Sequence, residues 1–285
     1  MADEEVELLH PELTAIRDWQ SFSSLSTYIR CPLQYMFRYV EGIKTPPAIA
    51  MARGSAGHKG LETNYKQKIT TRKDLPVDTV LDAVRDTFTQ IEPLIQDWED
   101  QKPGQVKDNV IKRVRKYQED FAPDIQPVEC EKEFILNIGK HKMKLYRDLK
   151  DENNTIRDSK FSDKARSQSQ TDNDLQGTIY TFVDSTPNFA FDCVTTNGVK
   201  TTVGKRTQQQ WDQLVNIYIP RIIRNIEMST ENGNFMPCDP ASWAHTPKFC
   251  GYWNICPAGG LNTNKVVVDM GQLTPDEHIK FDSLF

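Results

Sequence analysis

Apolar side chains recur at spacings of three and four along much of the first 120 residues, a pattern that predicts helices. The helical segments predicted there begin at Ser21, resume after a loop over 42–50 and run through Leu61 and Tyr65, and then cover 77–100 and 108–119. Within the first segment, Cys31-Pro32 either kinks the helix or separates two helices, because proline lacks the N–H that continues the hydrogen-bond ladder. We therefore expect an N-terminal helical region.

Near Pro127 the pattern changes to short strands that alternate with helices. The predicted strands are 131–138, 144–150, 155–160 and 189–196, and the predicted helices are 172–184 and 204–228, the latter kinked at Pro220. This order predicts a three-strand meander covered by a helix that returns to a fourth strand. We therefore expect an α/β (α+β) fold with a small mixed sheet flanked by helices.

The hairpin predicted over 144–160 carries two acidic residues. A turn centred near Asn153 places Asp148 opposite Asp158, with Cβ atoms roughly 5 Å apart. Two carboxylates at that distance repel by about 3 kcal/mol at an effective dielectric constant of 20, and a divalent cation removes this repulsion. Lys160 lies two residues after Asp158 and so shares its face of the strand. Two carboxylates and a lysine on one face are the groups needed for metal-assisted phosphodiester hydrolysis.

A solvated polar face is the alternative interpretation of this hairpin. The tripeptide Asp-x-Lys is common, and Asp148-Leu149-Lys150 is a second instance of it in the same hairpin. The hairpin alone therefore does not distinguish a metal site from an exposed surface.

Composition restricts the class of protein. The chain has 285 residues, of which 38% are hydrophobic and 26% charged, as in ordinary globular proteins with a sizeable core. No apolar run approaches the ~18 residues that span a bilayer, and the acidic N-terminus lacks the pattern of a secretory signal. We therefore expect a cytoplasmic protein with no membrane association and with mostly reduced cysteines.

The net charge of −5 argues against an overall electrostatic attraction to nucleic acid. Local groups of Lys and Arg nevertheless occur at 66–73, 107–116 and 200–206. An enzyme that releases its polymer in every cycle can work with such patches, although each one also fits a solvated helix face. Of the six cysteines, Cys130 and Cys193 fall in strand-like runs and are predicted to be small core residues.

Five further features match one family in order along the chain. They are Ser24-Leu25-Ser26-Thr27-Tyr28-Ile29-Arg30-Cys31-Pro32, Arg53-Gly54-Ser55-Ala56-Gly57-His58, Asp148 with Asp158-Ser159-Lys160, Gln176-Gly177-Thr178-Ile179-Tyr180, and the segment from Trp243 to Cys256. Together they resemble the RecB-type branch of the PD-(D/E)XK nuclease superfamily, and more narrowly phage exonucleases and CRISPR-associated nucleases with an iron–sulfur cluster. The chain departs from the family pattern in having no glycine just before Asp148 and in having Phe161 where threonine or serine often follows the lysine.

The resemblance implies roles for six residues. His58, Asp148 and Asp158 would hold Mg²⁺ or Mn²⁺, which as hard cations prefer oxygen ligands, and the histidine favours Mn²⁺. Lys160 would orient the attacking water or offset charge on the phosphate. Gln176 and Tyr180, one helical turn apart, would position the lysine or contact the DNA backbone, or else belong to an ordinary packed helix.

The resemblance also implies a 4Fe–4S cluster that joins the two ends of the chain. Its ligands would be Cys31, Cys250, Cys256 and His245, with Cys238 as the alternative fourth ligand. Tetrahedral zinc would suit the same set, and three unrelated thiols with no cofactor are the remaining alternative.

These features predict a RecB-like nuclease domain over 21–257 between terminal tails at 1–20 and 258–285. Its parts would be a helical region over 21–120, a catalytic core over 127–230 and a cysteine segment over 233–257. We expect a metal-dependent DNA exonuclease acting on single-stranded ends in phage or bacterial recombination, repair or genome processing, with recombination or replication proteins as partners. The alternatives are an inactive nucleic-acid-binding protein that retains the fold and a zinc-binding interaction module.

Overall fold

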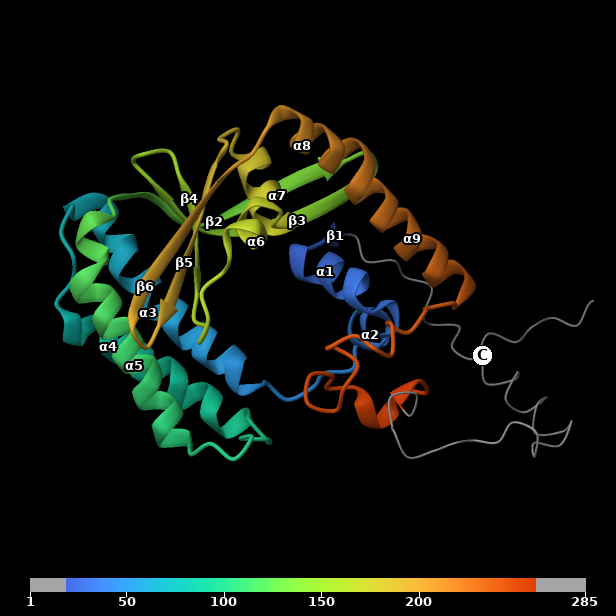
Figure 1. Cartoon of the computed structure of the whole chain (residues 1–285), viewed down its shortest axis with the longest axis horizontal. Coiled ribbons are helices and arrows are strands. Elements are labelled where there is room, and N and C mark those ends of the chain that lie inside the picture. Colours follow the sequence, from blue (N-terminus) through green and yellow to red (C-terminus); the bar gives the residue numbers. More distant parts are fainter. Residues whose placement is uncertain (1–18, 260–285) are drawn as a thin grey trace, which may run out of the picture. The chain divides into compact units, whose positions relative to one another are not determined.

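A computed structural model describes residues 19–259 (Figure 1). These residues form two compact units: a sheet unit of Trp19–Phe22 and Pro46–Pro220, and a cysteine unit of Ser23–Thr45 and residues 221–259. In the range described, no helix is both long and apolar enough to cross a membrane. The tails predicted at 1–20 and 258–285 lie almost entirely outside the described residues.

Six strands of the described chain form one mixed sheet in the sheet unit. They are β1 (Trp19–Gln20), β2 (Pro127–Ile138), β3 (His141–Asp151), β4 (Ile156–Lys160), β5 (Asn188–Thr195) and β6 (Gly198–Lys205). The order is β1-β3-β4-β5-β6, with β2 paired to β3 off this path. The pairs β1–β3 and β4–β5 are parallel and the others antiparallel, which confirms the predicted mixed sheet.

Helices account for most of the remaining regular structure. They are α1 (Phe22–Arg30), α2 (Pro32–Tyr35), α3 (Ile49–Thr71), α4 (Val77–Ile91), α5 (Pro103–Asp120), α6 (Gln168–Asp172), α7 (Leu175–Val183), α8 (Gln208–Gln213) and α9 (Ile219–Asn232). Pro32 starts α2 directly after α1 has ended, so the proline separates two helices, the second of the two predicted outcomes.

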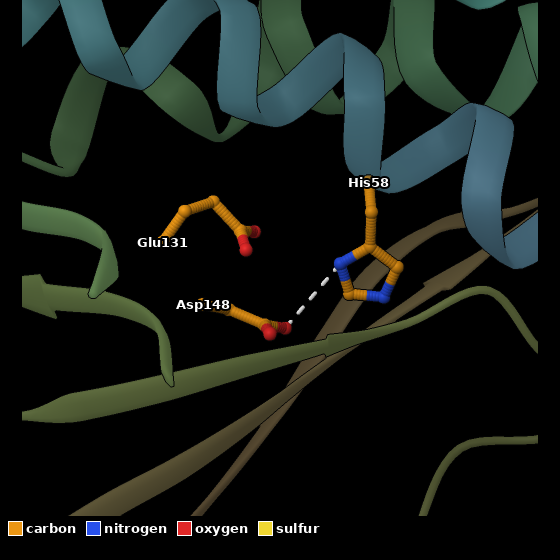
Figure 2. A group of neighbouring side chains, drawn as sticks. All are labelled: His58, Glu131 and Asp148. Carbon is orange, nitrogen blue, oxygen red and sulfur yellow. Dashed lines mark ion pairs between the residues drawn. The ribbon is translucent and has the colours of Figure 1, made fainter. Parts of the chain in front are cut away.

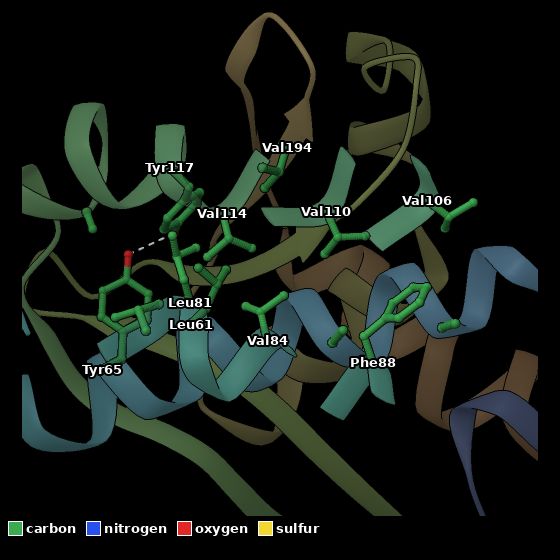
Figure 3. Close-up of a cluster of buried hydrophobic side chains, with 14 of the residues drawn as sticks. Leu61, Tyr65, Leu81, Val84, Phe88, Val106, Val110, Val114, Tyr117 and Val194 are labelled. Carbon is green, nitrogen blue, oxygen red and sulfur yellow. Dashed lines mark hydrogen bonds between the residues drawn. The ribbon is translucent and has the colours of Figure 1, made fainter. Parts of the chain in front are cut away.

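Helices cover both faces of the sheet. The apolar sides of α3, α4 and α5 pack together and onto strand residues such as Leu149 and Val194, forming the core cluster drawn in Figure 3. Phe189 lies an odd number of positions from Val194 on β5 and so points to the opposite face. There its ring packs against Gly177 of α7, where an added Cβ would come within 2.7 Å of it. The strands β3, β4 and β5 are thus held between two helical layers.

The predicted helix over 204–228 is wrong at its start. Residues 198–205 form β6, which pairs along its whole length with β5 through a turn at Thr196-Asn197. Gly198, with φ +119°, follows that turn, because glycine adopts such backbone angles without a steric penalty. The helix begins at Gln208, and a π-helical turn, Leu214–Tyr218, takes the place of a simple kink before Pro220.

Two other predicted helices have different limits. The helix predicted to reach residue 100 ends at Ile91, and Glu99 and Asp100 have positive φ angles of 47° and 62°, which an α-helix cannot contain. The helix predicted over 172–184 is α7, which starts three residues later, at Leu175, because Asp174 caps it by accepting a hydrogen bond from the backbone N–H of Gly177. Asp172 is the last residue of the separate short helix α6.

The cysteine unit joins the N-terminal helices to the C-terminal segment. The Tyr28 hydroxyl lies 2.8 Å from Oγ of Ser229, and the backbone N–H of Leu33 donates to the carbonyl of Met236 at 3.1 Å. These contacts bring residues about 200 positions apart in sequence into one small unit.

Candidate active site

The β3–β4 hairpin has the register that the sequence predicts. Leu149 pairs with Arg157 and Lys150 with Ile156, so continuing the same register sets Asp148 opposite Asp158. The turn between them is closed by Asp151, whose carboxylate accepts the backbone N–H groups of Asn153 and Thr155. A local Asx-type turn therefore determines which acidic residues meet.

Lys160 is held between the sheet and helix α7. Its Nζ lies 2.6 Å from Oδ2 of Asp158 and donates to Oε1 of Gln176 at 3.3 Å. The amide of Gln176 in turn donates to the Tyr180 hydroxyl at 2.9 Å. Four of the residues singled out in the sequence thus form one hydrogen-bonded chain, Asp158–Lys160–Gln176–Tyr180.

His58 reaches the acidic pair from helix α3. Its Nδ1 lies 3.3 Å from Oδ2 of Asp148, an oxygen that also accepts the backbone N–H of Ser159 at 3.4 Å. The structure therefore brings together all six residues to which the resemblance assigns a place at the site. Their roles in a reaction remain a proposal.

Glu131 of β2 joins this group, although the sequence analysis did not predict it. One ligand atom each from His58, Glu131 and Asp148 lies within 4.8 Å of the other two, the spacing expected of residues that share a cation (Figure 2). Asp158, which the resemblance proposes as a ligand, lies beside this group and is ion-paired with Lys160.

A signal for Glu131 was present in the sequence. Ile138 and His141 flank a two-residue turn, and counting back along the two strands from that pair sets Glu131 opposite Asp148. The backbone of Glu131 has φ +51°, an uncommon value for a residue inside a strand. Such outliers concentrate at functional sites, where the surrounding structure supports the strain.

Burial controls the protonation of the acidic residues. It raises the pKa of Asp148 to about 6 and that of Asp158 to about 7, even though the charge of Lys160 acts in the opposite direction on both. Burial also raises the pKa of Glu131, and the charge of Glu62 adds to this effect. A divalent cation among these groups would favour their ionised forms and so lower the same pKa values.

The pKa values of the two basic groups shift in opposite directions, although burial disfavours the charged form of both. Burial lowers the pKa of His58, so the imidazole is neutral at pH 7 and retains a lone pair that can bind a metal. For Lys160, burial disfavours the charged form, but the charge of Asp158 and the hydrogen bond to it raise the pKa overall. The lysine therefore stays protonated at neutral pH.

The predicted cysteine ligands lie in the cysteine unit. Cys31 caps helix α2, and its Sγ accepts the backbone N–H of Gln34 at 3.4 Å. Burial and then the charges of Cys31 and Cys250 raise the pKa of Cys238 to about 11, and its thiol hydrogen-bonds with that of Cys31. Burial likewise raises the pKa of Cys250 and Cys256, and the charge of Cys31 contributes to both shifts. The four thiols therefore lie near enough to influence one another electrostatically, but among the described residues only His58, Glu131 and Asp148 have ligand atoms spaced to share a metal ion.

His245, the predicted fourth ligand, contacts two residues of its own C-terminal segment. Its Nε2 lies 3.0 Å from the carbonyl oxygen of Ala258, and its ring meets that of Trp253 edge-on at a centroid distance of 5.3 Å. That His245 lies nearer to the other cysteines than Cys238 stays a prediction. Outside this group, Cys193 is buried and Cys130 packs against the core cluster, as predicted.

Comparison with known proteins identifies the class to which this fold and site belong. The sequence model of the PD-(D/E)XK nuclease superfamily matches residues 20–257, and the chain belongs to that superfamily. No curated protein is similar enough in sequence to count as a match.

Two solved structures match most of this chain at low sequence identity. SSO0001 is 15% identical with a TM-score of 0.43, covering 86% of this chain and 89% of its own. A protein described as a "putative exonuclease" from Eubacterium rectale is also 15% identical, with a TM-score of 0.48 and coverage of 86% and 88%.

Proposed function

We propose that this protein is a divalent-metal-dependent deoxyribonuclease of the RecB-type branch, acting as an exonuclease on single-stranded DNA ends. The observation that carries the proposal is the convergence of His58, Glu131 and Asp148 beside the Asp158–Lys160 ion pair. The setting would be the cytoplasm of a bacterium or of a phage-infected host, in recombination, repair or genome processing. Recombination or replication proteins would be its partners.

The donor set fits Mg²⁺ or Mn²⁺. Two carboxylates supply the oxygen ligands that both ions prefer, and the neutral imidazole favours Mn²⁺ of the two. We therefore propose His58, Glu131 and Asp148 as ligands, with Asp158 completing the site on the side of Lys160. When bound, the ion would polarise the scissile phosphate and acidify a water molecule.

Lys160 would stabilise charge and not accept a proton. Its raised pKa keeps Nζ protonated at neutral pH, so it cannot serve as a general base. Asp158 and Gln176 fix the ammonium group in place, which leaves its positive charge oriented in advance toward a bound phosphate. Tyr180 acts one step further away, by orienting the amide of Gln176.

A cleavage assay tests the proposal directly. End-labelled linear single-stranded DNA should be shortened progressively to small products with Mn²⁺ or Mg²⁺ and left intact with EDTA, whereas circular single-stranded DNA should survive. Cleavage of the circle would replace the exonuclease proposal with an endonuclease. Binding of DNA without cleavage under any metal condition would favour the alternative of an inactive binding protein.

Glu131→Gln tests the metal ligand that the structure adds. The amide keeps the size of the side chain and loses its charge, so cleavage should need about 10–100 times more Mn²⁺. Glu133→Gln is the matched control, since Glu133 lies on the same strand but pairs with Tyr146 and Lys144 at the surface. Equal metal requirements for the two variants would remove Glu131 from the site.

An iron–sulfur cluster is a second part of the proposal. Cys31, Cys250 and Cys256 would hold it, with Cys238 as fourth ligand because its thiol contacts that of Cys31, and His245 as the alternative. The cluster would link the two ends of the chain and have no part in the cleavage chemistry.

Metal analysis after anaerobic purification tests the cluster. The protein should be brown and contain iron, Cys238→Ala should lose the iron, and His245→Ala and Cys130→Ala should retain it. Zinc in place of iron would favour the tetrahedral zinc site. A colourless protein free of both metals and fully active in cleavage would reject the cluster and leave the nuclease unaffected.

A further inference from the structure

A cavity of about 500 Å³ opens beside the catalytic lysine. Gly54 and His58 of helix α3 line one side, and Lys160 together with the segment that follows β4, including Phe161, Lys164 and Arg166, lines the other. The volume lies within the range of about 300–1,000 Å³ found for small-molecule sites. Because His58 and Lys160 also belong to the candidate active site, the cavity is continuous with it.

Two side chains give this cavity a positive charge. Lys164 is exposed and Arg166 half-buried, and among the described residues neither has a carboxylate within ion-pair distance. The guanidinium carbon of Arg166 lies 5.2 Å from the ring centroid of Phe191, and Nζ of Lys160 lies 5.7 Å from the same centroid. The buried ring of Phe191 therefore places the charged groups of Lys160 and Arg166 on the same side of the sheet.

The acidic residue of this segment is already engaged. Asp163 pairs with the buried Arg113, whose guanidinium also donates to the carbonyl of Ser162 at 2.7 Å. Further along, the backbone N–H of Arg166 donates to Sγ of Cys193 at 3.3 Å. The segment is thus anchored at both ends, which fixes the backbone that carries Lys164 and Arg166 beside the cavity.

The glycines of α3 differ in what surrounds them. A Cβ at Gly57 would overlap the ring of Phe161, so packing explains that glycine, whereas a Cβ at Gly54 would meet no heavy atom within 4 Å. Glycine inside a helix is less favourable than alanine, and at Gly54 no neighbouring group requires it. The open space there belongs to the cavity.

We propose that this cavity binds the nucleotide adjoining the scissile phosphate, with Lys164 and Arg166 contacting its phosphate and Gly54 leaving room for its sugar and base. The inference rests on the proposed function for the identity of the polymer. It adds three residues of this chain that hold the strand and take no part in metal binding.

The test uses two variants and one matched control. Gly54→Leu projects a side chain into the cavity from a position where the added Cβ meets no heavy atom within 4 Å, and the double variant Lys164→Gln with Arg166→Gln removes the charge of these two residues. Gly104→Leu is the control, because Gly104 is also helical and also has no heavy atom within 4 Å of an added Cβ. Thermal unfolding confirms that each variant folds; should Gly54→Leu not fold, the double variant carries the test.

Binding is measured by fluorescence anisotropy with a fluorescein-labelled ten-residue oligothymidine in EDTA, and cleavage by KM and kcat with Mn²⁺. Gly54→Leu and the double variant should each bind at least about tenfold more weakly and raise KM by a similar factor. The double variant should also reduce the slope of log Kd against log salt by about 1.4. Gly104→Leu should match the wild type throughout.

The outcomes separate the cavity from the nuclease. If the wild type cleaves DNA and both cavity variants have unchanged binding and KM, the cavity does not bind the nucleotide, and the proposed nuclease function is unaffected. Binding that depends on the cavity without any cleavage would support the cavity and reject the nuclease. Absence of wild-type binding to the oligonucleotide would overturn both.

Discussion

Lys160→Ala is expected to reduce cleavage by about 10²–10³-fold while single-stranded DNA binding stays within a few-fold of wild type. The ammonium group is fixed by Asp158 and Gln176 and stays protonated, so its removal takes away charge stabilisation that matters most in the transition state. Single-turnover rates with Mn²⁺, measured beside binding in EDTA, give both quantities.

Lys150→Ala is the matched control for this variant. Asp148-Leu149-Lys150 repeats the Asp-x-Lys pattern on the neighbouring strand, but Lys150 pairs with Asp184 at 2.8 Å and not with the acidic pair. It should therefore cleave at close to the wild-type rate. Full activity in Lys160→Ala, or an equal loss in both variants, would place the catalytic centre elsewhere.

Asp158→Asn is expected to stabilise the metal-free protein at neutral pH while abolishing cleavage. The pKa of Asp158 in the folded state is about 7 against an ordinary 3.8, so the folded state binds this proton more tightly than the unfolded state. The wild type therefore loses stability as pH rises between these two values, and the amide avoids that loss. The gain should reach about 2 to 4 kcal/mol near pH 7 and shrink toward pH 4.

Urea unfolding in EDTA at several pH values measures this effect, and Asp184→Asn provides a contrast of opposite sign. Burial disfavours the charge of Asp184, but Lys150 and Arg147 together lower its pKa below the ordinary value. Loss of the Asp184 charge should destabilise the protein, because Arg147 is completely buried and would lose one of its carboxylate partners. If Asp158→Asn were less stable than the wild type at every pH, the buried carboxylate of Asp158 would stabilise the folded protein, contrary to the prediction.

Adding Mn²⁺ should make the wild type more stable to urea than Asp158→Asn. Metal that binds only the folded wild type raises its stability in proportion to the logarithm of the metal concentration. Asp158→Asn, with one anionic group fewer, should gain less from the same addition.

Local sequence determined the parts of this site that depend on neighbouring residues. The turn residues between β3 and β4 set the register that opposes Asp148 to Asp158, and two-residue alternation puts Lys160 on the same face. Helical spacing likewise predicts that Gln176 and Tyr180 share a face of α7, where they hydrogen-bond. Short-range geometry fixes such relations, so they can be read without knowledge of the fold.

Contacts between distant segments were decided only by the tertiary structure. Glu131 lies opposite Asp148 by the register of the β2–β3 hairpin, but the left-handed backbone conformation with which it enters the site is not predicted by its residue type. The edge strand β6 is defined by backbone pairing with β5 more than by its own side chains, and it was mistaken in part for a helix. The contact between the thiols of Cys238 and Cys31 likewise depends on the path of the C-terminal segment, which the spacing of the cysteines does not reveal. Spacing along the chain thus predicted most of the residues that meet at the candidate site, and packing added the contacts between distant segments.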